Sequence, residues 1–137
     1  VAMGNDFSEE KNMDLVDFCE ATGLRRHELA VVKSKDIYWQ GDRLIVYVRQ
    51  GKGGKAREAT IVEGMEARVL QIIDGQDPER RIFLQIPAKM DVHSYRRQYS
   101  FKRQEQAPEL EVSKDLGHNR VDVIRGHYSR MPKIPIA

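Results

Sequence analysis

Three side chains that can transfer protons lie in LGHNRVDVIRGHYSR, residues 116–130 of this 137-residue chain: His118, His127 and Tyr128. Tyrosine is a poor nucleophile at neutral pH, because its reference pKa is about 10. A histidine ten residues before a tyrosine, in a stretch that looks helical, therefore has two interpretations. Either these are ordinary residues of a packed helix, or Tyr128 reacts and other groups in the chain assist it.

Three further polar clusters lie upstream: GLRRHEL at 23–29, GKGGKAR at 51–57 and HSYR at 93–96. Taken singly, each is explained as well by a surface arginine, a soluble hairpin tip or a surface pair. GKGGKAR is not a Walker A loop, because no Gly-Lys-Ser/Thr closes it. His93 and Arg96 share one face of an expected helix, near its N-terminus, which is a setting that suits a phosphate.

Charge is sorted into blocks along the chain, although the net charge is only +2. Residues 21–57 carry nine Lys/Arg and three acids, and residues 80–103 carry seven Lys/Arg and one acid. If the basic blocks meet in the fold, they form a positive surface whose obvious partner is a polyanion. The alternative is that they are the solvated faces of helices.

The elements that position these clusters follow from periodicity and capping. The sequence predicts a helix from Ser8, as N-cap, to a stop at Gly23. It also predicts a helix with Asp91 as N-cap. The full set of expected helices is 8–22, 25–32, 62–75, 91–106, 111–117 and 119–130, the last capped by Asn119. The expected strands are roughly 37–39, 43–50 and 55–61.

The predicted fold is therefore α+β: one domain over 1–137, mostly helical, with a small antiparallel β-sheet of two or three strands and an irregular tail at 131–137. No apolar run approaches the ~20 residues that span a bilayer, and no signal peptide is visible. The lone Cys19 excludes an internal disulfide framework and is expected to be a core thiol. We therefore expect a cytoplasmic protein without membrane contact.

In chain order, the clusters resemble the catalytic domain of tyrosine recombinases, the phage-integrase family. The matching pieces, spread over about residues 8–130, are GLRRHEL, a lysine in a β-hairpin, HSYR, LGH and a tyrosine. The resemblance implies catalytic roles for Arg25, Lys52, His93, Arg96, His118 and Tyr128, with Glu28 in support. Arg25 is preferred to Arg26 because it directly follows Gly-Leu, and Lys52 is preferred to Lys55 as the first lysine of KGxK. DNA contacts are expected from Arg26, Lys55, Arg57, Arg97 and Arg120.

The implied function is that of a site-specific recombinase or integrase acting on double-stranded DNA. Two arginines hold the scissile phosphate, Lys52 protonates the leaving 5′ oxygen, and Tyr128 becomes a 3′-phosphotyrosine. This chemistry needs no metal or other cofactor. The family normally carries an N-terminal core-binding domain, for which the chain has no room, so we expect an excised catalytic domain. The resemblance also implies association with the nucleoid, and the full-length protein is expected to form a tetramer on DNA.

The chain departs from the family pattern in three ways. The spacing from LGH to tyrosine is ten, where nine is commoner; the segment between the hairpin and HSYR is short; and RRQYSFKRQEQ is strongly polar where the family usually has small apolar residues. The main alternative function is a non-catalytic DNA-binding module or recombination regulator. A type IB topoisomerase shares the chemistry. A further alternative is a zinc site from Cys19, His93, His118 and His127, but these residues lack any CxxC or HxxxH spacing.

Overall fold

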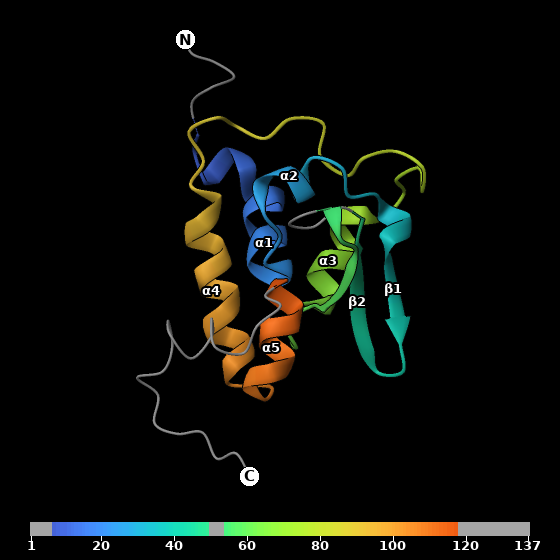
Figure 1. Ribbon diagram of the computed structural model, residues 1–137. Coiled ribbons are helices and arrows are strands. Elements are labelled where there is room, and N and C mark those ends of the chain that lie inside the picture. The colour runs from blue at the N-terminus through green and yellow to red at the C-terminus, as the bar shows by residue number, and fades with distance from the viewer. Residues whose placement is uncertain (1–6, 50–53, 118–137) are drawn as a thin grey trace.

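The computed structural model describes residues 7–49 and 54–117 of the chain (Figure 1). Its α-helices are α1 (Met13–Thr22), α2 (Arg26–Leu29), α3 (Glu66–Ile73), α4 (Val92–Gln104) and α5 (Glu109–Leu116). Its strands are β1 (Ile37–Gln40), β2 (Arg43–Val48) and β3 (Arg57–Thr60), and short 3₁₀ turns lie at Glu10–Asn12 and Ser34–Asp36. The predicted α+β class with a small antiparallel sheet is confirmed.

The sheet is a meander in the order β1-β2-β3, with both pairs antiparallel. Val46 pairs with Ile37 on one side and Ala59 on the other, and all three side chains are buried in the main core. Side chains alternate across a strand, so Ile45 and its partner Thr60 face the opposite way. Both are nevertheless buried, because α5 packs on β3.

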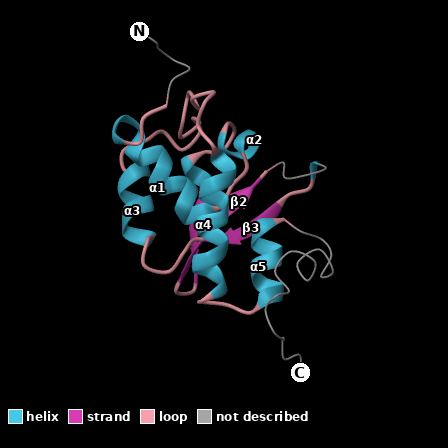
Figure 2. Cartoon of the chain, turned by 90° about the vertical axis from the view of Figure 1, so that its left-hand side faces the viewer, coloured by secondary structure: helices cyan, strands magenta, loops and turns pink. Residues whose placement is uncertain are grey.

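The helices form a layer beside the sheet (Figures 1 and 2). Helix α1 packs against both α3 and α4, and α5 packs against α4 as well as β3. Cys19 lies in this core, and burial raises its pKa to about 12. It is therefore a core thiol, as predicted.

Three helices are shorter than predicted. Helix α3 begins at Glu66, not at 62, because Gly64 has a positive φ of 102° and the Val62 amide donates to the Ala21 carbonyl. The first α-helix begins at Met13, not after Ser8, because Asn12 leaves the helical region (φ −128°, ψ 34°) and its side-chain amide donates to the Ser8 carbonyl. The second helix makes one turn and ends at Leu29. Beyond it the chain runs extended enough for the Val32 carbonyl to accept from the Ile82 amide, and this pairing ties the loop before α4 to the core.

The predicted caps at Gly23 and Asp91 are confirmed. Gly23 ends α1 in the left-handed conformation, and the Asp91 carboxylate accepts from the Ser94 amide. Gly23 is also a close approach, since a Cβ there would lie 2.4 Å from Cδ2 of Tyr99. The helix expected over 119–130, with Asn119, and the tail lie outside the described residues. In the part described, no helix has the length and apolarity needed to cross a membrane.

Candidate active site

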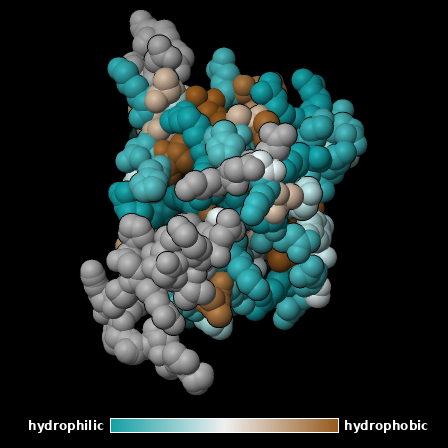
Figure 3. Space-filling view, in the orientation of Figure 1, coloured by the Kyte–Doolittle hydropathy of each residue, from teal (hydrophilic) through white to brown (hydrophobic). Residues whose placement is uncertain are grey.

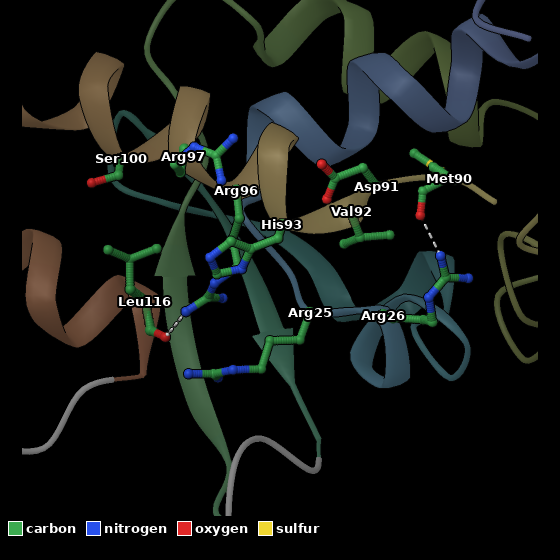
Figure 4. Close-up of a pocket in the computed structure, with 10 residues that line it drawn as sticks. All are labelled: Arg25, Arg26, Met90, Asp91, Val92, His93, Arg96, Arg97, Ser100 and Leu116. Carbon is green, nitrogen blue, oxygen red and sulfur yellow. Dashed lines mark hydrogen bonds between the residues drawn. The ribbon is translucent and has the colours of Figure 1, made fainter. Parts of the chain in front are cut away.

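A cavity of about 500 Å³ opens between the start of α4, the start of α2 and the end of α5 (Figure 4). Its lining is strongly basic: four arginines and one histidine against one aspartate. The lining residues are Arg25, Arg26, Met90, Asp91, Val92, His93, Arg96, Arg97, Ser100 and Leu116. The cavity thus joins two clusters that are distant in sequence, GLRRHEL and HSYR, and places them beside the leucine of LGH.

Arg96 lies at the centre of the site and is only 8% exposed. Its Nη1 donates to the Gly23 carbonyl and its Nη2 to the Leu116 carbonyl, each at 2.6 Å. These two carbonyls belong to the C-terminal ends of α1 and α5. The last carbonyls of a helix lack intrahelical partners, and the negative end of the helix dipole favours a cation. One guanidinium therefore joins two helix ends and is fixed in orientation by them.

Arg25 stands at the edge of the same cavity, just before α2. Its main-chain amide donates to Oε1 of Glu28 at 2.8 Å, and its Nη1 lies 3.2 Å from Oε2 of the same carboxylate. The side chain is 21% exposed. Arg25 is therefore restrained at its base and its tip but remains reachable from the cavity.

The Glu28 carboxylate is fully buried and is shared between two arginines. Arg57, on β3, binds it with both Nη atoms at 2.8 and 3.0 Å, and its Nε donates to the Asp115 carbonyl at 2.8 Å. Burial acts to raise the pKa of Glu28, but the hydrogen bonds and charges of Arg57 and Arg25 outweigh it and lower the pKa below its ordinary value. Glu28 is thus an ionised anchor beneath the site.

Arg57, one of the expected DNA contacts, turns toward the interior of the protein. Its side chain is 10% exposed and its guanidinium is directed at Glu28 and α5. A buried carboxylate offers a bidentate partner that matches the guanidinium fork, and this accounts for the inward position. The internal contacts make Arg57 part of the support of the site.

Gly117, the glycine of the LGH motif, has a structural role at the end of α5. It closes α5 with φ of 86°, in the left-handed region that favours glycine. A Cβ there would lie 3.0 Å from Nη1 of Arg25 and 3.1 Å from Nη1 of Arg57. The two guanidinium groups therefore pack on the face of Gly117 that a side chain would occupy. No property of a single glycine in the sequence indicates this contact.

The remaining predicted residues differ in position. His93 is exposed on the first turn of α4 and lies with Arg96 and Arg25 around the cavity (Figure 4), and Arg97 is exposed at the rim. Arg26 turns away from Arg25 and donates to the carbonyls of Pro87 and Met90 at 3.1 and 2.5 Å, which ties down the loop before α4.

Several predicted residues cannot be placed in the cavity. Lys55 is exposed before β3 and does not line it. Lys52, His118, Arg120 and Tyr128 lie outside the described residues, as does His127. The structure therefore brings together Arg25, His93 and Arg96 of the predicted catalytic set, with Glu28 beneath them.

No tyrosine within residues 7–49 and 54–117 lines the cavity. Tyr95 donates its hydroxyl to the Glu9 carboxylate, and burial together with that carboxylate raises its pKa. Tyr99 is buried and donates to the Thr60 carbonyl at 2.6 Å, and burial raises its pKa well above the ordinary value. Burial and Glu58 raise the pKa of Tyr38 to about 12. These phenols are held protonated, which makes them poor nucleophiles.

The face of the molecule seen in Figure 1 is largely hydrophilic where described residues form its surface. Figure 3 shows mostly polar side chains on the face seen in Figure 1, with only small separate apolar areas among them. Such a surface suits a charged, hydrated ligand better than an apolar one.

No family model matches the sequence, and no curated protein matches it. Solved structures do. XerH site-specific recombinase, bound to palindromic difH substrate in a post-cleavage complex, superposes with a TM-score of 0.57 at 16% identity, over 92% of this chain and 46% of that one. The Tn1549 transposon integrase in complex with transposon right end DNA gives 0.58 at 15% identity, over 87% of this chain and 54% of that one.

The chain therefore shares its fold with the matched parts of these two tyrosine recombinases. It spans about half the length of these recombinases. The resemblance deduced from five short motifs is thus confirmed at the level of the fold.

Proposed function

We propose that this chain is the catalytic domain of a site-specific DNA recombinase or integrase, which breaks and rejoins DNA through a covalent phosphotyrosine. One observation carries the proposal. Arg25 and Arg96 come from clusters far apart in sequence. Together with His93 they line one cavity between α2 and α4. The shared fold supports the same conclusion.

The two arginines suit a phosphodiester. A guanidinium presents a planar fork that matches two phosphate oxygens. When negative charge builds on the non-bridging oxygens during attack, fixed donors stabilise the transition state more than the ground state. The carbonyls of Gly23 and Leu116 fix Arg96, and Glu28 fixes Arg25. Both donors are therefore oriented before the substrate arrives.

Tyr128 is the proposed nucleophile. Its oxygen attacks phosphorus, the bond from phosphorus to the 5′ oxygen breaks, and a 3′-phosphotyrosine forms. The proton of the phenol passes to His93 or His118, and the leaving 5′ oxygen takes a proton from Lys52, with Lys55 as the alternative donor. The attack by a terminal 5′ hydroxyl reverses these steps and rejoins the DNA, so no metal or other cofactor is required. The inward hydroxyls of Tyr95 and Tyr99 favour Tyr128 over them.

The proposed partner is double-stranded DNA. Arg26 and Arg97 at the cavity, together with Lys55 and Arg120, are the proposed phosphate contacts, and such contacts give affinity that falls steeply with salt. The protein is proposed to act on DNA of the nucleoid, in the cytoplasm, and to assemble as a tetramer on its site.

The decisive experiment uses nicked duplexes with randomised sequence around the nick, because the target sequence is unknown. The chain is incubated with this library, denatured, and covalently attached DNA is recovered with the protein and sequenced. We expect an adduct that Tyr128→Phe abolishes. Tyr47→Phe is the control, since Tyr47 is 38% exposed and lies away from the cavity on β2.

Two results would contradict the proposal. An adduct that persists in Tyr128→Phe and disappears in another tyrosine variant would show that Tyr128 is not the nucleophile. Salt-dependent DNA binding without any adduct would instead support the non-catalytic DNA-binding module.

A further inference from the structure

A second buried cluster of charge lies behind the site, between α4, α5 and β3. Arg103, on α4, is fully buried, and it donates to two carboxylates of α5: from Nη2 to Glu111 Oε2 at 2.5 Å and from Nε to Asp115 Oδ2 at 3.2 Å. Arg103 belongs to RRQYSFKRQEQ, the segment that is polar where the family pattern has small apolar residues. Its burial shows that the polar sequence of α4 is not simply a solvated face.

Asp115 connects this cluster to the sheet. Its other oxygen, Oδ1, accepts from the main-chain amide of Thr60 at 3.1 Å. Thr60 ends β3, which is an edge strand of the sheet. The Thr60 carbonyl in turn accepts from the Tyr99 hydroxyl of α4 at 2.6 Å. Side chains from two helices thus satisfy both main-chain groups of one residue, and this fixes where α5 ends relative to α4 and β3.

The main chain at this end of α5 is what holds the arginines of the site. The Asp115 carbonyl accepts from Arg57, and the next carbonyl, of Leu116, accepts from Arg96. Arg57 grips Glu28, which restrains Arg25. A shift of Asp115 would therefore move the acceptors that orient Arg96 directly and Arg25 through two intermediates.

We propose that Arg103 and Asp115 are positioning residues that set the orientation of Arg96 and Arg25. The proposal rests on the proposed function, because it assigns them to phosphate cleavage without contact with the DNA. Misplacement of a reacting or stabilising group by about 1 Å can cost on the order of 10²-fold in rate. A loss of that size is the expected effect on the cleavage step at saturating DNA, with DNA affinity unchanged.

The test compares Asp115→Asn with Arg43→Met. Asparagine keeps the shape and an acceptor for the Thr60 amide but removes the charge that faces Arg103. Arg43 is the matched control because its Nη1 binds the same Glu111 oxygen at 2.6 Å, while its side chain is 42% exposed and it has no bond to Asp115. Loss of such an exposed pair should change the rate less than about fivefold.

The first measurement needs no cleavage. In ¹⁵N-labelled chain, hydrogen exchange of the Arg57 Nε–H reports on its bond to the Asp115 carbonyl. We expect exchange about 10-fold or more faster in Asp115→Asn and unchanged in Arg43→Met. The second measurement is the rate of covalent adduct formation at saturating DNA, together with the dissociation constant.

The outcomes separate the two proposals. Folded Asp115→Asn with wild-type exchange at Arg57 and a wild-type rate overturns the positioning role. So does an equal loss of rate in Arg43→Met, since that would show that any ion pair on α5 has the same effect. Wild-type chain that forms no adduct overturns the proposed function, while the exchange of Arg57 still decides the positioning role. Should Asp115→Asn unfold, Arg103→Lys is compared in the same way, because lysine keeps a cation beside Asp115 and removes the fork.

Discussion

Two buried arginines of α4, Arg96 and Arg103, are held in opposite ways. Arg96 donates to two main-chain carbonyls at helix ends, whereas Arg103 donates to the carboxylates of Glu111 and Asp115. A carbonyl oxygen orients a guanidinium and leaves its formal charge in place. A carboxylate orients the guanidinium and also cancels its charge. The half of α4 near its N-terminus thus presents fixed positive charge at the cavity, and the other half uses an arginine to join elements.

The comparison shows that a polar helix does not have one kind of function along its length. Burying a charge requires compensation, and the compensation chosen decides what the side chain can still do. The two arginines are seven residues, or about two turns, apart and lie on the same face of α4, so the difference comes from their partners on α1 and α5. The following predictions test that difference, with the largest expected effect first.

Replacing Arg103 with methionine should have the largest effect, on stability. It leaves the buried Asp115 without its charged partner, and breaking such a pair costs about 3–5 kcal/mol of the free energy of unfolding. Urea unfolding measures the loss. Arg43→Met, which removes an exposed partner of the same cluster, should cost no more than about 1 kcal/mol. Equal losses in the two variants would show that burial does not distinguish these arginines.

Replacing Arg96 with lysine should act mainly on cleavage. Lysine keeps the charge but cannot span the Gly23 and Leu116 carbonyls as a planar fork. We expect the cleavage rate at saturating DNA to fall about 10²–10³-fold, with about 1–3 kcal/mol lost from the free energy of unfolding as a buried carbonyl loses its donor. Arg25→Lys should lose comparable rate with less stability, because Arg25 is more exposed. Normal cleavage by Arg96→Lys would show that the helix-end bonds serve only the fold.

Gly117→Ala should have a smaller effect, centred on the site. Left-handed backbone costs a residue with a Cβ about 1–2 kcal/mol, and the added methyl group meets the tips of Arg25 and Arg57. The cleavage rate should therefore fall by more than the loss in the free energy of unfolding accounts for. Gly41→Ala is the control, since Gly41 also has positive φ but a Cβ there meets nothing within 4 Å. If both variants cleave DNA equally well, the packing of the guanidinium groups on Gly117 is not important for activity.

The smallest effect concerns acid unfolding, where the two carboxylates act in opposite directions. The pKa of Glu28 is lowered, so its stabilisation is present above its unfolded pKa and is lost as the pH falls through the folded value. Burial raises the pKa of Asp115 despite Arg103, so the folded state gains stability relative to the unfolded state as that group protonates. Asp115→Asn removes this offset. Urea midpoints below about pH 5 should then fall more steeply than in wild type, and parallel curves would contradict the prediction.

Much of the fold was predictable because it depends on local signals. Alternating apolar residues around β2, the turn glycines and the Asp91 cap identified the strands and α4. The starts of α1 and α3 were wrong because Asn12 interrupts the first helix and Gly64 has a positive φ before the third. The length of α2 was wrong for a different reason from these two, because Val32 pairs with a distant loop. This pairing is a tertiary effect that no local pattern reports.

The site was predictable only as a set of residue types in order. The sequence indicated that Arg25, His93 and Arg96 belong together, and the structure places them at one cavity. The sequence could not show that Arg57 turns inward, because nothing in KAREAT distinguishes an arginine that contacts Glu28 from one that faces solvent. Arg103 and Asp115 were invisible for the same reason: their importance comes from mutual burial, which only the folded chain creates.

The bridge that Arg96 makes between two helix ends also affects when the site can exist. Its two acceptors lie 73 residues before it and 20 residues after it in the chain. Contacts of such long range form only when the elements that carry them have docked. During synthesis, α1 and α4 emerge before α5, so a nascent chain that still lacks Leu116 cannot complete this bridge. The orientation of Arg96 at the cavity is therefore set only after nearly the whole described domain has been translated and folded.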